Sequence, residues 1–217
     1  YIGKDGVKKP LGSIGHLAAF SFHETKNIQS GEGGLLAIND ERFISRAEII
    51  WEKGTNRAEF FRGEVNKYGW VDTGSSFLPS EVVAAFLWAQ LEDLDKIQSR
   101  RKEIWKQYNS FFSLRNSDLF DIPHVPSYST NNGHMYFIVC KTPEIRSSII
   151  AKLKENSIIS VFHYLSLHKS KYYQSKHDRR ELTNTDFYSD NLVRLPLFFD
   201  LTSDDVKLIA KLIVNGK

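Results

Sequence analysis

The stretch SFHETKNIQSGEGGLL, residues 21–36, places a single lysine, Lys26, between an apolar segment and three glycines that fall within four positions. A lysine that acts as a nucleophile must lose its proton, and the reference pKa of its ammonium is about 10.4. The residues HLAAFSF that lead into the stretch favour the neutral amine, because apolar surroundings disfavour the charged form. Lys26 is therefore a candidate catalytic nucleophile, with a solvated surface lysine as the ordinary alternative.

The neighbours of Lys26 indicate what the amine would react with. Ser21 can offer a hydroxyl to a phosphate group, and the glycines allow backbone N–H groups to approach an anion closely. After Gly31 and Gly33, a dinucleotide-binding fingerprint would require a third glycine where this chain has Leu36. The pattern therefore argues against a dinucleotide, and a lysine beside a phosphate-binding hydroxyl favours pyridoxal phosphate.

The composition limits the other function classes. The chain has 217 residues, 41% of them hydrophobic, and can bury a sizeable core. Its formal charge of +3 comes from interspersed residues, 29 basic and 26 acidic, which argues against nucleic acid as a partner. Without a run of about 18 apolar residues or a signal-like start, we expect a cytoplasmic protein that does not cross a membrane. Cys140, the single cysteine, lies in the apolar run MYFIVC and is expected to be a buried thiol, and no spacing indicates a metal site.

The first half of the chain predicts strands followed by helices. GSIGHLAAFSFH reads as a buried strand and GLLAIND as a short strand, and apolar residues from Phe43 to Ile50 predict a helix that ends near Gly54. Residues 54–79 have no sustained period and are expected to form a long ordered loop, which is often functional. Ser80 is expected to cap a helix of more than 25 residues, interrupted once around residues 98–101.

The second half predicts a small α+β unit from about residue 114 onward. HMYFIVC reads as a strand, and a helix should follow with Thr142 as its cap and Pro143 at its first position. IISVFHY reads as the next strand. The last helix should open with a capping box in which Thr202 and Asp205 bond each other's backbone N–H groups.

The order of several sequence blocks resembles a known family. SFHETKN followed by GEGG is similar to the lysine motif of the DegT/DnrJ/EryC1/StrS family of sugar aminotransferases. Four more blocks resemble the family in the same order: RAEIIWEKGTNRAEFFRGEVNKYGWVDTGSSFLPSEVVAAFLWAQLE, GHMYFIV, VFHYLSLH and LVRLPLFFDLTSDDV. Agreement across so many ordered blocks is far more specific than the lysine motif alone.

The resemblance implies an α/β fold, the C-terminal part of a type I (aspartate aminotransferase-like) transferase that depends on pyridoxal 5′-phosphate. Residues 1–113 would form the end of the large cofactor-binding domain, including a long spine helix, and residues 114–217 a small α+β C-terminal domain. Because the resemblance begins partway through the large domain, groups that stack on the coenzyme ring and pair with its nitrogen are expected upstream. We therefore expect the chain to be incomplete as an enzyme.

The resemblance also implies roles for individual residues. Lys26 would be the catalytic lysine that binds the cofactor and moves protons, and Ser21 would bind the cofactor phosphate. The family uses an asparagine before the spine helix to reach the phosphate of the partner in a homodimer, and here serines, Ser75 and Ser76, lie nearby. Residues expected to bind substrate, with core or interface packing as the alternative, are Tyr68, Trp70, His134, His163 and Tyr164; His168 belongs to the same histidine block.

Within the family, ETKN after SFH and the loop KYGWVDTGSSF favour members that act on a TDP-linked sugar. The expected reaction converts TDP-4-keto-6-deoxy-D-glucose to TDP-4-amino-4,6-dideoxygalactose, with L-glutamate as amino donor, for a cell-surface polysaccharide such as enterobacterial common antigen. A family dehydratase is disfavoured, because it would carry histidine in place of Lys26. A non-catalytic fragment and a nucleotide-sugar-binding module remain the alternatives.

Overall fold

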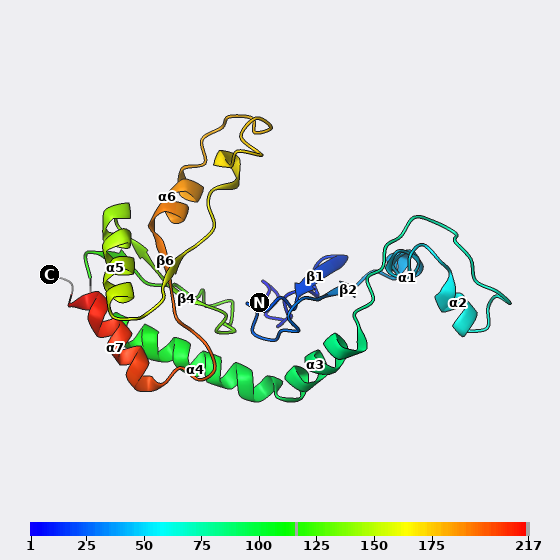
Figure 1. Ribbon diagram of the computed structural model, residues 1–217, viewed down its shortest axis with the longest axis horizontal. Helices are drawn as coiled ribbons and strands as arrows, with labels where there is room; N and C mark the ends of the chain where they lie inside the picture. Colours follow the sequence, from blue (N-terminus) through cyan, green and yellow to red (C-terminus); the bar gives the residue numbers. More distant parts are fainter. Residues whose placement is uncertain (116, 216–217) are drawn as a thin grey trace. The chain divides into compact units, whose positions relative to one another are not determined.

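A computed structural model describes residues 1–115 and 117–215 as a mixed α/β chain with two compact units, Tyr1–Leu94 and Asp95–Lys217 (Figure 1). Within the described residues, no helix combines the length and the apolar character that crossing a membrane requires. The contacts group the long helix α4 with the second unit. The expected domain boundary, after residue 113, stays a prediction about the family fold.

The first unit begins with a hairpin. Strands β1 (Leu17–Ser21) and β2 (Gly34–Ile38) are antiparallel, and Ser21 pairs with Gly34 at the end nearest the connecting loop. Strand β1, which was expected to be buried, is largely exposed. For example, 43% of the Phe20 surface remains accessible to solvent. The physical reason is that the described hairpin is a sheet of two strands, which leaves most of both faces uncovered.

Helical segments complete the first unit. The predicted helix after Phe43 is present as α1 (Ile44–Trp51), preceded by a 3₁₀ turn, η1 (Glu41–Phe43). The prediction of a continuous loop over residues 54–79 was wrong in part, because residues Arg57–Phe61 form a short helix, α2. Ser80 caps α3 (Glu81–Glu92) as predicted, because its hydroxyl accepts a hydrogen bond from the backbone N–H of Val83.

The predicted long helix is interrupted earlier than expected. The break falls at Asp93, between α3 and α4 (Leu94–Ser113), and residues 98–101 continue the helix. Asp93 has φ −94° and ψ 12°, and its N–H bonds the carbonyl of Leu91. The backbone leaves α-helical geometry at this residue, which ends α3.

The second unit is built on a four-stranded antiparallel sheet with the order β3-β4-β6-β5. The described strands are β3 (Phe120–Asp121), β4 (Tyr136–Cys140), β5 (Val161–Phe162) and β6 (Leu192–Leu195). The helices and turns of this unit are α4, α5 (Pro143–Glu155), η2 (Leu167–Lys169), α6 (Thr183–Asn191) and α7 (Ser203–Val214).

The predicted caps of α5 and α7 are confirmed. The strand expected over IISVFHY is reduced to two residues, because only these pair with β6. Helix α6 and strand β6 were not expected. The segment between β5 and α6, coloured yellow to orange in Figure 1, extends beyond the sheet.

The core of the second unit forms where α4 packs on β4. The rings of Tyr108 and Tyr136 stack with centroids 5.0 Å apart, and Phe112 meets Phe120 edge to face at 5.4 Å. The buried hydroxyl of Tyr108 donates to the Pro196 carbonyl at 3.0 Å, which satisfies its polar end. Apolar residues of α5, β6 and α7 complete this core: Ile149, Leu153, Val193, Leu195, Val206, Ile209 and Ile213.

Candidate functional site

Lys26 lies in the loop that connects β1 to β2, where the sequence predicts a turn. Backbone bonds close this loop: Phe22 N donates to the Gly33 carbonyl at 2.8 Å, and Ser30 N donates back to the Phe22 carbonyl at 2.8 Å. Gly31 has φ +77°, a conformation that favours glycine, and its carbonyl accepts from the Glu24 N–H at 2.8 Å. These main-chain bonds close the loop, and the Gln29 side chain adds to them by accepting from the Gly31 N–H at 2.7 Å.

The Lys26 side chain is half-buried and takes no part in closing the loop. Its backbone N–H donates to the His23 carbonyl at 2.9 Å, which turns the chain at this position. Across residues 1–115 and 117–215, its ammonium makes no hydrogen bond or ion pair. An amine without a protein partner is available to react with a ligand.

Ser21 and His23 form a small polar group beside the lysine turn. The Ser21 hydroxyl accepts from the His23 N–H at 3.3 Å, so its own hydrogen is left to donate elsewhere. The Thr25 N–H donates to His23 Nδ1 at 3.2 Å, and His23 Nε2 lies 3.5 Å from Glu32 Oε1. A neutral ring that accepts at Nδ1 carries its proton on Nε2.

Sequence reasoning treated His23 only as a flanking residue, although the motif SFHET contained it.

Gly33 and Gly34, at the end of the loop, are tightly packed. A Cβ on Gly33 would lie 2.7 Å from Ser30 Oγ, and one on Gly34 would lie 3.0 Å from the Phe20 carbonyl. This close approach explains why the motif needs small residues at these two positions.

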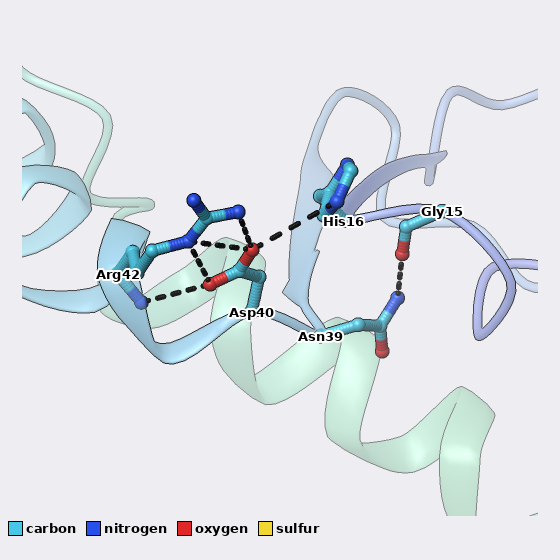
Figure 2. Close-up of polar contacts among 5 residues, drawn as sticks. All are labelled: Gly15, His16, Asn39, Asp40 and Arg42. Atoms are coloured by element: carbon cyan, nitrogen blue, oxygen red, sulfur yellow. Dashed lines mark hydrogen bonds and ion pairs between the residues drawn. The ribbon is translucent and has the colours of Figure 1, made fainter.

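At the other end of the hairpin, a polar cluster fixes the entry to β1 and the exit from β2 (Figure 2). The side-chain amide of Asn39 donates to the carbonyls of Gly12 at 2.7 Å and Gly15 at 2.8 Å. The Asp40 carboxylate accepts from the Arg42 guanidinium, with Nε 3.0 Å from each carboxylate oxygen and Nη2 2.6 Å from Oδ2. These bonds lower the pKa of the Asp40 carboxyl below its ordinary value. The cluster therefore anchors the strands that carry the lysine loop.

Tyr68, Trp70 and Ser76 lie on one loop of the first unit, which folds back against the junction of α1 and α2. Ser76 forms a β-bridge with Glu52, and Trp70 forms one with Thr55. The Trp70 side chain is 83% exposed, whereas the half-exposed Tyr68 meets Phe60 edge to face at 5.6 Å. Ser76 is exposed. The loop presents an aromatic side chain, Trp70, to its surroundings.

His134 belongs to the second unit and is held through its backbone. Its carbonyl accepts from Arg101 Nη2 at 2.6 Å, and the adjacent Gly133 carbonyl accepts from Nε at 3.1 Å. Burial lowers the pKa of the Arg101 guanidinium below its ordinary value. A Cβ on Gly133 would lie 2.8 Å from the Arg101 backbone, so this turn packs directly on α4.

His163 and Tyr164 follow β5, and their rings lie 4.9 Å apart. Within the described chain, His163 Nδ1 is buried and lacks a hydrogen-bond partner. Burial, assisted by the positive charge of Arg194, lowers the pKa of the imidazole below its ordinary 6.5. This shift favours the neutral ring, while Tyr164 is 78% exposed.

The structure thus places the predicted residues in three groups, two in the first unit and one in the second. Ser21 ends strand β1 and Lys26 lies in the loop that follows it, while Tyr68, Trp70 and Ser76 share the second loop of the same unit. His134, His163 and Tyr164 lie in the other unit. Among the described residues, no group of three or more His, Cys, Asp or Glu side chains could hold a metal ion.

Comparison with known proteins places these features in a family. The sequence profile of the DegT/DnrJ/EryC1/StrS aminotransferase family matches residues 2–214. The uncharacterised protein MJ1066 of Methanocaldococcus jannaschii is 25% identical over 213 residues, which cover 94% of this chain and 55% of MJ1066. The chain therefore spans about half the length of the curated relative it matches.

Two solved structures are similar along nearly the whole chain. PseC of Helicobacter pylori, an aminotransferase involved in the biosynthesis of pseudoaminic acid, has a TM-score of 0.82 at 22% identity, over 95% of this chain and 54% of PseC. Spr1654 of Streptococcus pneumoniae, described as a sugar aminotransferase and solved in its pyridoxal phosphate form, has a TM-score of 0.80 at 25% identity, over 95% of this chain and 53% of Spr1654.

These neighbours confirm the expected fold class, the partial α/β fold of an aminotransferase that depends on pyridoxal phosphate. Aminotransferases of this family use pyridoxal phosphate as their cofactor. With its profile matched from residue 2 to residue 214, the chain belongs to the DegT/DnrJ/EryC1/StrS aminotransferase family.

Proposed function

We propose that this chain carries the catalytic lysine of a sugar aminotransferase, and that the amine is that of Lys26. The observation that carries the proposal is the Lys26 ammonium, which has no hydrogen-bond or ion-pair partner among the described residues and lies at the turn that follows Ser21 and His23. Structural lysines of folded proteins are usually solvated or paired with a carboxylate. A half-buried, unpaired lysine in a family of aminotransferases is best explained by a ligand.

The residues of the hairpin loop fit pyridoxal phosphate chemically. Lys26 supplies a primary amine, and Ser21 retains a hydroxyl hydrogen that can be donated to a phosphate oxygen. A Cβ on Gly31 would meet no atom within 4 Å, so the loop is open at this position. When bound, the cofactor supplies the electron sink on which transamination depends.

The other proposed roles rest on the sequence blocks that resemble the family. The Lys26 amine would move a proton between the cofactor and the carbon that gains or loses the amino group, which is general acid–base catalysis. Tyr68 and Trp70 would bind the sugar nucleotide. A role in substrate binding is proposed separately for His134, His163 and Tyr164. Ser76 would reach the cofactor phosphate of the partner subunit in a homodimer.

The identity of the sugar substrate and of the amino donor is also part of the proposal. The sequence blocks ETKN and KYGWVDTGSSF support TDP-4-keto-6-deoxy-D-glucose as amino acceptor and L-glutamate as amino donor. The product would be TDP-4-amino-4,6-dideoxygalactose, for a cell-surface polysaccharide such as enterobacterial common antigen, made in the cytoplasm. PseC, which serves the biosynthesis of pseudoaminic acid, supports the broader class of sugar substrates.

The test is covalent labelling of the chain. Incubation with pyridoxal phosphate, reduction with borohydride and peptide mapping should give one dominant adduct, on the peptide that contains Lys26. Lys26→Ala should abolish this adduct, whereas Lys67→Ala, which removes an exposed lysine of the same unit, should leave it unchanged. Even labelling of many lysines, or an unchanged dominant adduct in Lys26→Ala, would refute the assignment.

A sugar-nucleotide-binding module without catalysis is the second candidate, favoured by the 83% exposure of Trp70. Exposed aromatic rings are common at binding surfaces. Titration with TDP, followed by tryptophan fluorescence, should show saturable quenching that is lost in Trp70→Ala. TDP binding without any borohydride-reducible adduct on Lys26 would favour the binding module over the enzyme.

A further inference from the structure

Asp186, a residue of α6 that the sequence did not single out, binds three side chains of the segment that follows β5. Its Oδ1 accepts from the Ser166 hydroxyl at 2.7 Å and lies 3.2 Å from His168 Nε2, while Oδ2 lies 2.9 Å from Lys169 Nζ. The carboxylate is partly screened from water, since its side chain is 24% exposed. One carboxylate thus holds three positions that lie 17 to 20 residues earlier in the chain.

The same face of α6 makes a second contact with this segment. Ser189 follows Asp186 by three positions, so the two side chains share one face of the helix. The Ser189 hydroxyl donates to the Tyr164 carbonyl at 3.3 Å. Helix α6 therefore contacts both ends of the segment: Ser189 bonds Tyr164 at its start, and Asp186 pairs with Lys169 at its end.

Apolar packing contributes little to holding this segment. Leu165 is 76% exposed and Leu167 is 65% exposed, so neither side chain anchors the backbone in the described structure. Segments with few buried apolar contacts open readily. Polar bonds, among them those of Asp186 and Ser189, therefore restrain the backbone between Tyr164 and Lys169.

The charges around Asp186 favour its ionised form. The bonds from Lys169 and then from Ser166 lower the pKa of the Asp186 carboxyl below its ordinary value. His168 faces it from the same segment, and the His177 ring lies 5.1 Å from the His168 ring. Asp190, one turn further along α6, adds a second negative charge near Lys169.

We propose that Asp186 is a positioning residue for sugar-nucleotide recognition: it fixes residues 163–169, and with them His163 and Tyr164, in the arrangement that receives the ligand. The inference rests on the proposed function, because that function assigns these two side chains to the substrate. Asp186 itself touches neither substrate nor cofactor in this scheme. Its carboxylate acts by holding the backbone that presents them.

The test combines hydrogen exchange with ligand binding in the full chain. Asp186→Asn should accelerate amide exchange over residues 163–169 by about tenfold or more, because charge-assisted bonds are lost. It should also weaken binding of TDP-glucose, a stable relative of the proposed substrate, by a similar factor. Asp190→Asn removes the same charge from the same helix but breaks none of these bonds, so both properties should stay as in the wild type. Asp186→Glu, which keeps the carboxylate, should restore part of the affinity.

The outcomes separate this inference from the proposed function. Unchanged exchange over residues 163–169 in Asp186→Asn would overturn it, as would faster exchange with unchanged affinity for TDP-glucose. A wild-type chain that does not bind TDP-glucose would overturn it even if Lys26 is labelled by pyridoxal phosphate. If Lys26 is not labelled, the proposed function fails, while the exchange and TDP-glucose measurements still decide the role of Asp186.

Discussion

Gly54 and Gly74 lie so close together that neither position has room for a side chain. A Cβ on Gly74 would lie 2.1 Å from the Gly54 backbone nitrogen, and one on Gly54 would lie 1.8 Å from the Asp72 carbonyl oxygen. Gly54 also has φ +78°, and its carbonyl accepts from the N–H groups of Val71 and Asp72. This contact fastens the loop that carries Tyr68 and Trp70 to the end of α1.

Gly74→Ala should therefore destabilise the first unit by about 1–3 kcal/mol, the usual cost of inserting a methyl group where the backbone cannot move aside. The measurement is chemical denaturation followed by tryptophan fluorescence. Gly69→Ala is the matched control, because a Cβ at Gly69 in the same loop would meet no atom within 4 Å. Equal stability of the two variants would show that the loop does not need the close contact.

Cys140 should be unreactive in the folded protein. The residue is fully buried in β4, and burial raises the pKa of its thiol to about 11, so the reactive thiolate is scarce at neutral pH. Ellman's reagent at pH 8 should modify Cys140 only after denaturant is added. Modification of the native chain at the rate of the denatured chain would contradict the burial.

Thr202→Ala should cost about 0.5–2 kcal/mol of unfolding free energy, the range for loss of a helix N-cap. Thr202 Oγ1 accepts from the Asp205 N–H at 3.1 Å, and Asp205 Oδ2 accepts from the Thr202 N–H at 3.0 Å. The measurement is urea denaturation monitored by circular dichroism. Thr202→Ser keeps the capping hydroxyl and should retain most of the stability; an equal loss in both variants would argue against the cap.

His163 should make stability depend on pH. Because its folded pKa lies below the ordinary 6.5, the unfolded chain binds more protons near that pH, and stability rises with pH. The contribution should be fully present above pH 6.5 and should decline as the pH falls below it. His163→Gln should flatten the profile between pH 7 and pH 5, whereas His124→Gln, which changes an exposed ring, should not. Identical profiles for wild type and His163→Gln would contradict the prediction.

The sequence predicted the features whose signals are local. The hydroxyls of Ser80, Thr142 and Thr202 each accept a bond from the backbone three positions later, as their position before a helical pattern suggested. The turn around Lys26 was predictable for the same reason, since the glycines that permit it lie within eight residues. Such features depend on neighbours along the chain.

The features that sequence reasoning missed depend on distant contacts. Helix α6 has the sequence TNTDFYSDN, which shows no sustained apolar period, and its position follows from side chains such as Ser189 that bond residues far upstream. Asp186 has no sequence signal, because its three partners lie across an intervening segment of the chain. The helix break was predicted at residues 98–101 instead of at Asp93, because the apolar pattern continues on both sides of Asp93.

The closure of the Lys26 loop has an evolutionary consequence. Because main-chain bonds such as Phe22 N to the Gly33 carbonyl hold the loop, the identity of side chain 26 can change without refolding the hairpin. The fold of the hairpin and the chemical identity of side chain 26 can therefore evolve independently. A descendant can therefore exchange the amine for another group and acquire a new reaction, while it inherits the architecture intact.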